Sequence, residues 1–405
     1  MQDEGARTQF VYSCAALVAA GFVARLVLAW YSIGTNDAGA WRKFAAGVDA
    51  HGLIDAYARF PSLNHPPLPA LWAAGALRVS RASGLSFEFV FKLPAILADV
   101  GSCLVLARIW SARRGGARSG WIAALLMAWN PAAILVGACH CNTDNVYAFL
   151  CLLACYFADR RNLFAAGAAL AAAINVKLIP VLLVLPLLSL CRDRRDVWQF
   201  LNGLHVGIYP FIPILIGAAE PFARNALGYN PQANRWGVGF ALYELYLHEP
   251  TRRLALDAMR FYFDTGRWFI LAAVALLSFF SWRRRAWDAY QLGALALSIF
   301  LTLTPGFGLQ YAVIAAPLLL AASLRWGAAY GLIAGVFIFT AYATVWTGTV
   351  PFYSFFDGPF SRAAALTGAI TWAILVVYSL RTLARGNRSP TLSGHGPDVI
   401  PASRS

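Results

Sequence analysis

The sequence predicts an all-α polytopic membrane protein, a bundle of about twelve transmembrane helices. Of the 405 residues, 59% are hydrophobic and only 13% are charged, and the mean hydropathy is +0.58. So few charged side chains cannot cover a soluble globule of this size. Apolar runs of about 15 to 22 residues recur between arginine clusters, whereas a membrane β-barrel would show shorter segments of alternating polarity.

The first span is expected over residues 10–31. This run exceeds the apolar part of a signal peptide and lacks a clear small-residue cleavage site, so we expect it to stay in the protein. Arg25 lies near its outer end, where the long side chain can carry the guanidinium to the membrane interface or to an anionic headgroup.

Residues 32–88 are expected to form an outer loop that carries amphipathic surface helices. The segment 41–60 is too polar to span, and the apolar run that ends at Val79 is too short and begins after three prolines. This choice fixes the topology. The arginine-rich loop 108–118 becomes cytoplasmic, in agreement with the positive-inside rule, and Asp37 and Asp144 share the outer side.

The other spans follow from the remaining apolar runs, and both chain ends are then cytoplasmic. They are expected at residues 89–110, 121–139, 146–158, 163–174, 178–190, 197–218, 268–282, 289–303, 312–324, 330–346 and 363–380. Residues 1–384 form one membrane domain with a long outer loop at 219–267. Residues 385–405, rich in Ser, Pro, Gly and Arg, are expected to be a disordered cytoplasmic tail.

The distribution of charges and of cysteines argues against a nucleic-acid partner and against a zinc site. The formal net charge is +14, but the arginines are scattered between apolar runs, so we expect no nucleic-acid partner. Most cysteines lie inside apolar runs and are interpreted as small buried hydrophobes. The sequence Cys139-His140-Cys141 lacks the spacing of a zinc site, and we expect no metal or other cofactor, although a divalent ion is left open.

Asp37 is the strongest candidate for a functional residue. It follows the first span, where a carboxylate can face water beside lipid headgroups and act as general base toward a sugar hydroxyl. A helix cap or a solvated loop acid is the alternative. Asp144 has the same alternative, but two acids in segments otherwise poor in acids favour a joint role, one as base and the other orienting the acceptor.

Further candidates lie beside these acids or in other outer segments. His140 can act as acid, base or donor to a phosphate, and Lys177 either reaches the interface or faces a phosphate in a groove. Arg235 is a candidate phosphate clamp, with a solvated charge as the alternative. The remaining candidates are polar loop residues, namely Asn64 and His65 before the prolines and Gln310 and Tyr311 after a glycine-bearing loop without a nucleotide-binding pattern.

These motifs, in this order, resemble the GT-C superfamily of membrane glycosyltransferases, and most of all the branch of GPI mannosyltransferase I and its bacterial relatives. The likeness is carried by Asn36-Asp37, by His65 to Leu68, by Asn130-Pro131 before Asn142-Thr143-Asp144, by Lys177 with Pro180, and by Pro305 to Tyr311. The resemblance implies a GT-C-type bundle, a polyprenyl-phosphate sugar as donor and Asp37 as catalytic base. The first outer loop departs from the pattern, because the neighbours of Asp37 are Asn36 and Ala38 rather than a second acid.

We therefore expect an inverting hexosyltransferase, with mannose favoured, that acts on a lipid, glycan or protein acceptor at the outer face of a bacterial inner membrane. Asp37, Asp144 and His140 are the expected catalytic residues, and Asn36 and Asn142 orient the acceptor. Lys177, Arg235, His65, Asn64, Gln310 and Tyr311 bind the donor phosphate. The expected partners are the donor, membrane lipids and a possible further subunit. The alternatives are a secondary transporter or lipid flippase and a non-catalytic scaffold subunit.

Overall fold

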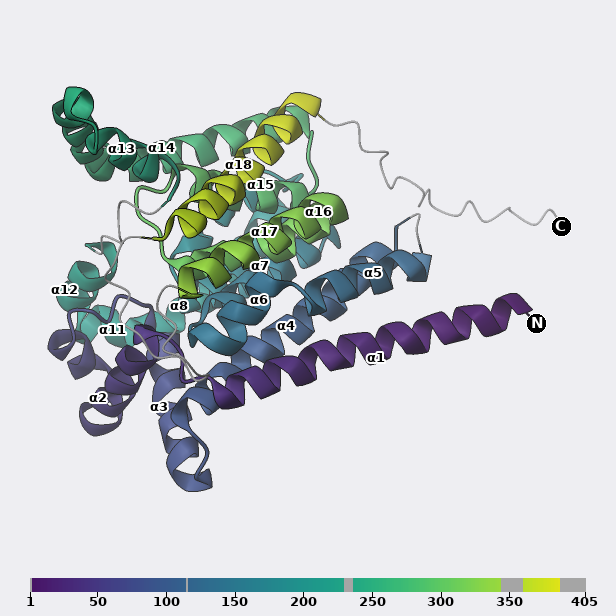
Figure 1. Ribbon diagram of the computed structural model, residues 1–405, viewed down its shortest axis with the longest axis horizontal. Coiled ribbons are helices and arrows are strands. Elements are labelled where there is room, and N and C mark those ends of the chain that lie inside the picture. Colours follow the sequence, from purple (N-terminus) through teal and green to yellow (C-terminus); the bar gives the residue numbers. More distant parts are fainter. Residues whose placement is uncertain (1, 114–115, 229–235, 344–359, 387–405) are drawn as a thin grey trace.

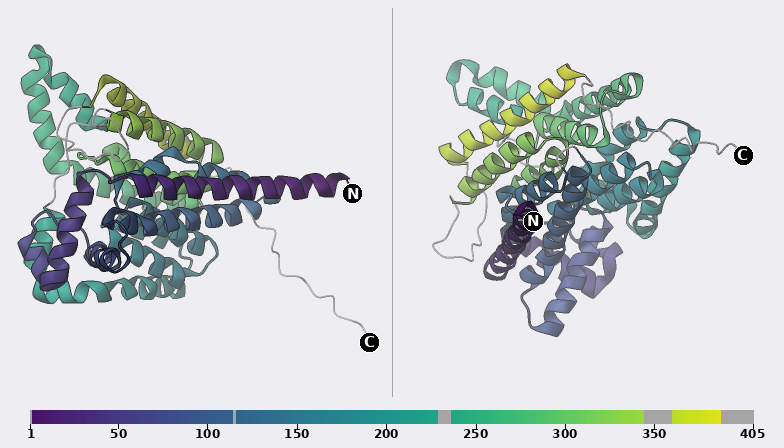
Figure 2. Two further views of the ribbon diagram at one scale, coloured as in Figure 1. Left: turned by 60° about the horizontal axis from the view of Figure 1, so that its bottom comes forward. Right: turned by 90° about the vertical axis from the view of Figure 1, so that its right-hand side faces the viewer.

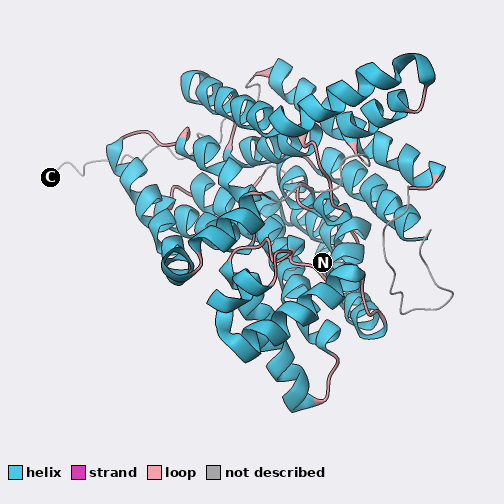
Figure 3. Cartoon of the chain, turned by 90° about the vertical axis from the view of Figure 1, so that its left-hand side faces the viewer, coloured by secondary structure: helices cyan, strands magenta, loops and turns pink. Residues whose placement is uncertain are grey.

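The structure is a computed structural model that describes residues 2–113, 116–228, 236–343 and 360–386. These residues are almost entirely helical, and no strand occurs among them (Figure 3). The predicted all-α class is therefore confirmed. The expected tail after residue 386 lies outside the described residues.

The first half of the chain contains nine elements. They are α1 (Gln2–Tyr31), α2 (Asn36–Arg59), α3 (Pro67–Ser83), α4 (Phe87–Ser111), α5 (Gly116–Ala128), α6 (Pro131–Ile134), the π-helical turn η1 (Leu135–His140), α7 (Asp144–Asp159) and α8 (Leu163–Val176).

The second half contains shorter and more often broken helices. They are η2 (Ile179–Leu183), α9 (Val184–Leu188), α10 (Arg194–His205), η3 (Val206–Phe211), α11 (Ile212–Gly217), α12 (Ala219–Phe222), η4 (Ala223–Leu227), α13 (Gly237–Tyr246), η5 (Glu249–Thr251), α14 (Arg252–Arg284), α15 (Ala289–Leu303), η6 (Leu309–Val313), α16 (Ala316–Ala322), α17 (Leu324–Ala343) and α18 (Arg362–Arg385).

The chain is a multi-pass membrane protein, but the expected count of about twelve spans is not confirmed. Six helical segments of the described chain are long and apolar enough to cross a membrane, or seven if the bent pair α5 and α6–η1 counts as one. The six are Thr8–Tyr31, Phe87–Ser111, Arg194–Gly217, Glu249–Arg284, Leu324–Tyr342 and Arg362–Arg385.

The central helices explain this difference. α15 has 15 residues and α7 has 16, so at 1.5 Å per residue each is about 22 to 24 Å long, short of the ~30 Å hydrocarbon layer. Almost every residue of α15 is buried, and its neighbours are α7, α9, α14, α16 and α18. A helix covered by protein on all sides does not need the length of a lipid-facing span.

The outermost helix is α1, which lies along one side of the bundle (Figures 1 and 2). It contacts α4, α5 and η1, while Val23, Val27 and Trp30 are about half exposed. A surface of this composition is suited to lipid tails. The N-terminal end of α1 and the C-terminal end of α18 lie at the same end of the bundle (Figure 1).

The helix α14 begins inside residues 219–267, the segment predicted to be a long outer loop. It runs without a break for 33 residues, about 50 Å, which is far longer than a bilayer's apolar layer. Its first half projects from the bundle together with α13 (Figure 1). The segment interpreted as loop is therefore largely helical, apart from residues 229–235, which lie outside the described part.

A second hydrophobic core lies at the opposite end of the bundle from the N-terminus (Figure 1). It joins α2 and α3 to the first turn of α4 and to α11 and α12, and we call it the outer core. Its buried side chains include Trp41, Tyr57, Phe91 and Phe222. Asn225, in η4, connects this part of the chain to the end of α2, because its Nδ2 donates to the carbonyl oxygens of Tyr57 and Phe60 at 2.8 and 3.2 Å.

Candidate functional site

The polar residues of the site come from a break in the helical path between η1 and α7. The π-helical turn ends at His140, and Cys141 adopts a left-handed conformation with φ of 69°, uncommon for a residue with a side chain. This turn leaves the side chains of His140 and Asn142 at the junction between the membrane bundle and the outer core. Cys139 packs in the bundle and Cys141 in the outer core.

The start of α2 is docked onto this break by backbone contacts. The backbone N and the Oγ1 of Thr35 both lie 3.2 Å from the carbonyl oxygen of His140. Gly34 makes the approach possible: its φ is +113°, and a Cβ there would lie 2.7 Å from the Cβ of Cys141. The tight contact between the two segments fixes where Asp37, in the first turn of α2, meets residues 140–142.

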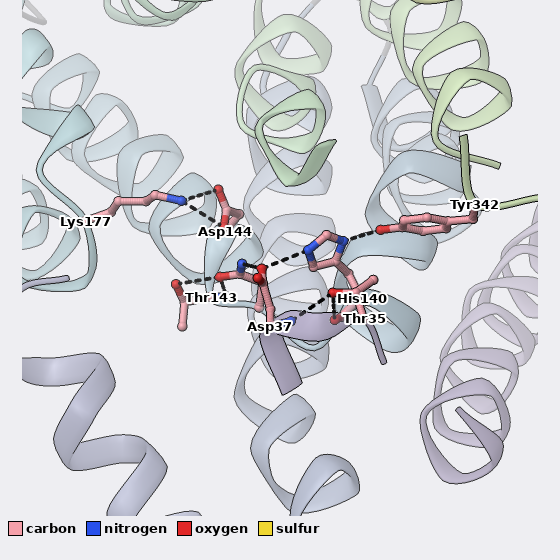
Figure 4. A network of polar contacts seen from close by, with 8 residues as sticks. Thr35, Asp37, His140, Thr143, Asp144, Lys177 and Tyr342 are labelled. Carbon is pink, nitrogen blue, oxygen red and sulfur yellow. Dashed lines mark hydrogen bonds and ion pairs between the residues drawn. The ribbon is translucent and has the colours of Figure 1, made fainter. Parts of the chain in front are cut away.

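Asp37 is held by two donors on one oxygen (Figure 4). The Nε2 of His140 lies 3.0 Å from its Oδ2, and the Nδ2 of Asn142 donates to the same atom at 2.6 Å. No described residue donates to the other oxygen, Oδ1, and the side chain is 30% exposed. A fixed carboxylate with one unused oxygen is thus available to a ligand.

The charge of Asp37 is stabilised by its neighbours. Burial acts to raise its pKa, but the hydrogen bond from His140 and the charge of Lys177 hold the pKa below its usual range. Its place in the first turn of α2 adds the favourable field of a helix N-terminus. Asp37 is therefore an anion at neutral pH.

His140 connects Asp37 to a tyrosine that the sequence did not point to. Its Nδ1 forms a hydrogen bond with the hydroxyl of Tyr342, near the end of α17 (Figure 4). If Tyr342 donates to Nδ1, the proton of the ring lies on Nε2, which then donates to Asp37. We assign this neutral tautomer from the network.

Asp144 forms a second, fully buried part of the network. The Nζ of Lys177 lies 3.0 and 3.2 Å from its two oxygens, and Tyr147 donates to Oδ1 at 2.9 Å. The ammonium also lies 4.5 Å from the ring centre of Tyr311. Asp144 is 0% exposed, so this pair is an internal structural element beside Asp37.

His65 lies near the same residues but forms no hydrogen bond. Both of its ring nitrogens are buried without a partner, and its ring meets the edge of Trp41 at 4.8 Å between centres. Burial, helped by the charge of Lys177 and opposed by that of Asp37, lowers its pKa to about 3. His65 is consequently neutral at physiological pH.

The other expected site residues do not join this network. Asn36 is exposed at the start of α2, and the side chains of Asn64 and Gln310 form no hydrogen bond with a described residue. Arg235 lies outside the described residues. The structure thus brings together Asp37, His140 and Asn142, with Asp144 and Lys177 close by (Figure 4). The ring of Tyr311 lies against Lys177.

A buried charge network under the site was missed by sequence reasoning. Arg25 was expected at the interface, but that interpretation is wrong: the side chain is 0% exposed and pairs with Asp99 at 2.9 Å. Asn145 donates to the other oxygen of Asp99. The available signal was Asp99 itself, an acid inside an apolar run, where an ionised residue normally has a partner.

The free groups of the site are hydrogen-bonding groups of Asp37 and His65. All seven cysteines are buried, and within the described residues no serine or cysteine is hydrogen-bonded to a histidine. The described residues also contain no group of three His, Cys, Asp or Glu side chains that could hold a metal ion. What remains available is the unused oxygen of Asp37 and the free ring nitrogens of His65.

The comparison with known families changes the functional interpretation. The family model described as "GPI transamidase subunit PIG-U" matches residues 50–310, which is more than half of the chain. No curated protein matches the sequence. The prediction of an inverting hexosyltransferase is therefore wrong, as is the polyprenyl-phosphate sugar donor that it required, and the GT-C resemblance finds no support in this match.

Proposed function

From the premise that this chain belongs to the PIG-U family of GPI transamidase subunits, we propose that it is a non-catalytic, membrane-embedded subunit of a transamidase complex. We further propose that it binds the polar headgroup of the lipid-linked acceptor. The binding residues are Asp37, His65, His140 and Asn142, and together with the buried supporting pair of Asp144 and Lys177 we call them the Asp37 cluster.

The observation that carries this proposal is the state of Asp37. Its carboxylate is fixed by His140 and Asn142 on one oxygen, while the other oxygen lacks a donor and the side chain is partly exposed. A carboxylate held in this way loses little freedom when a ligand binds. A glycolipid places hydroxyl and charged groups next to an apolar tail, and this cluster lies beside apolar helices.

The charge pattern supports a position on the outer side of the membrane. The end of α4 and the start of α5, between which the sequence is rich in arginine, lie at the same end of the bundle as the N-terminus of α1, and α2 and α3 lie at the other end (Figure 1). The positive-inside rule assigns the arginine-rich end to the cytoplasm. We propose that residues 1–384 act as one membrane domain with a cytoplasmic tail at 385–405, and keep a bacterial inner membrane as the prediction for its location.

The role in a complex is tested by purification from native membranes. The full chain, tagged and extracted in a mild detergent, should co-purify with a small, constant set of membrane proteins that includes a hydrolase-like catalytic subunit. Recovery of the chain alone after mild crosslinking would overturn the proposed complex.

Ligand binding is tested with the purified chain in phosphatidylcholine nanodiscs. A synthetic inositol glycolipid should bind to the wild type, and Asp37→Ala should weaken binding about tenfold or more, because a hydrogen bond to a charged group contributes about 1.5 to 3 kcal/mol. Asp55→Asn is the matched control, since Asp55 is an exposed acid on the same helix. Equal binding to all three proteins would remove Asp37 from the site.

A further inference from the structure

The two carboxylates of the Asp37 cluster have different partners. Asp144 is paired with the ammonium of Lys177, whereas the partners of Asp37 are the imidazole of His140 and the amide of Asn142. The other buried cation at this end, Lys92, donates to the carbonyl oxygen and hydroxyl of Ser32 and so caps the end of α1. Among the described residues, no lysine or arginine forms an ion pair with Asp37.

Lys177 is poorly placed to bind an anion. It contacts both oxygens of Asp144 at 3.0 and 3.2 Å, and the rings of Tyr311 and Tyr147 lie 4.5 and 5.6 Å from its Nζ. A phosphate would have to displace Asp144, which is fully buried and would then lack its counter-ion. The earlier expectation that Lys177 holds a phosphate is therefore disfavoured by these contacts.

Two groups at the site have an unused hydrogen-bond acceptor, the carboxylate of Asp37 and one ring nitrogen of neutral His65, whose other nitrogen carries an unused N–H. The Oδ1 of Asp37 has no donor among the described residues. Asp37 and Trp41 are one helical turn apart on α2, and Trp41 contacts the ring of His65, whose nitrogens are buried without partners. A buried polar atom without a partner marks a place where a ligand or water completes the network.

We propose that the Asp37 cluster recognises a primary ammonium group on the headgroup of its lipid ligand. One N–H of the ammonium bonds to the Oδ1 of Asp37 and another to a ring nitrogen of neutral His65. This inference rests on the proposed function and agrees with its chemistry, because a transamidase transfers an acyl group to an amine. The subunit would hold the acceptor by the group that reacts, in its protonated and unreactive form.

The test compares two ligands that differ only in this charge. A synthetic inositol glycolipid that ends in a primary amine, and its N-acetylated twin, are each titrated against the full chain in phosphatidylcholine nanodiscs. The wild type should bind the amine roughly tenfold more tightly, since a charge-assisted hydrogen bond contributes about twice as much as a neutral one. Asp37→Asn should bind both lipids alike, and Asp55→Asn should keep the preference.

The outcomes separate the inference from the proposed function. Equal wild-type affinity for both lipids overturns the ammonium site and leaves lipid binding standing, whereas binding of neither lipid overturns both. His65→Gln keeps an uncharged hydrogen-bonding group and should retain most of the preference, while His65→Phe should reduce it severalfold. A melting curve for each variant shows whether it is folded. If Asp37→Asn is unfolded, the two His65 variants still test the site.

Discussion

Arg25 and Asp99 form an ion pair inside the helical bundle, with 2.9 Å between Nε and Oδ2 and side-chain exposures of 0% and 2%. The guanidinium also bonds to the carbonyl oxygens of Met127 and Ala128, the last residues of α5. Pro131 has no N–H to donate to the carbonyl of Met127, which accepts instead from the N–H of Asn130 at 3.2 Å and from Arg25. The pair therefore stabilises the break that leads into η1 and the site.

Replacing Arg25 should destabilise the protein strongly. Arg25→Met leaves the carboxylate of Asp99 buried without its counter-ion, and we expect a loss of about 3 to 5 kcal/mol in the free energy of unfolding. The measurement is thermal unfolding in detergent, with Arg108→Met as control because Arg108 is exposed on α4. The double variant Arg25→Met/Asp99→Leu should recover part of the loss; a double variant less stable than Arg25→Met would contradict this explanation.

Replacing Lys177 should also destabilise the protein, because it leaves the buried carboxylate of Asp144 without its counter-ion. Lys177→Met removes the only ammonium on Asp144 among the described residues, and Asp144 is 0% exposed. We expect a loss of about 3 kcal/mol or more in unfolding free energy, together with weaker lipid binding because the Asp37 cluster is disturbed. Lys43→Met provides the control, since Lys43 is exposed and only stacks on Phe60.

The conservative variant Lys177→Arg should be better tolerated than Lys177→Met. It keeps the positive charge beside Asp144 and should therefore retain more of the free energy of unfolding. If both variants unfold at the wild-type temperature, the pair contributes nothing and its description as a structural element is wrong.

The sequence predicts the class of fold well and the number of spans poorly. Composition and repeated apolar runs indicate a helical membrane protein, and this is confirmed. A window of residues cannot tell whether an apolar run faces lipid or protein, so α7 and α15 were counted as spans although they are short and buried. The long helix α14 was missed because its first half is too polar to look like a span.

The site was predictable only where polar residues stand out in the sequence. Asp37, His140, Asn142 and Lys177 interrupt apolar runs, and the structure brings them close together. Tyr342 lies within an apolar run, and its contact with His140 spans 202 positions. The class of reaction was mispredicted, because a polar cluster at a membrane surface does not identify the chemistry performed there.

His65 should make stability depend on pH. Its folded pKa is about 3 and its ordinary value is 6.5, so between these values the unfolded chain binds the proton and the folded protein does not. The free energy of unfolding should fall as the pH is lowered through this range, by on the order of 2 kcal/mol at pH 5 relative to neutral pH. His65→Phe should remove this component.

Asp37 should add a second pH-dependent component at lower pH. Its pKa is held below the ordinary value, so its stabilising effect is complete above that value and is lost as the pH falls through the folded pKa. Chemical unfolding curves measured from pH 2 to 8 separate the components, because Asp37→Asn should change the part below about pH 4 and leave the part between pH 5 and 6.5 unchanged. The same slope in wild type and His65→Phe would mean that His65 is not buried in solution.

Gly34 should be required for the contact between α2 and η1. With φ at +113°, Gly34→Ala is strained, and its Cβ would lie 2.7 Å from Cys141 and 3.1 Å from the carbonyl oxygen of His140. We expect a loss of about 1 to 3 kcal/mol and reduced glycolipid binding, because the first turn of α2 moves away from His140. Gly75→Ala is the matched control: no atom lies within 4 Å of its added Cβ on α3, and the change should raise stability by up to about 1 kcal/mol. Glycolipid affinity and melting temperature measured on both variants decide the matter, since equal behaviour of the two would show that the close approach at Gly34 does not position Asp37.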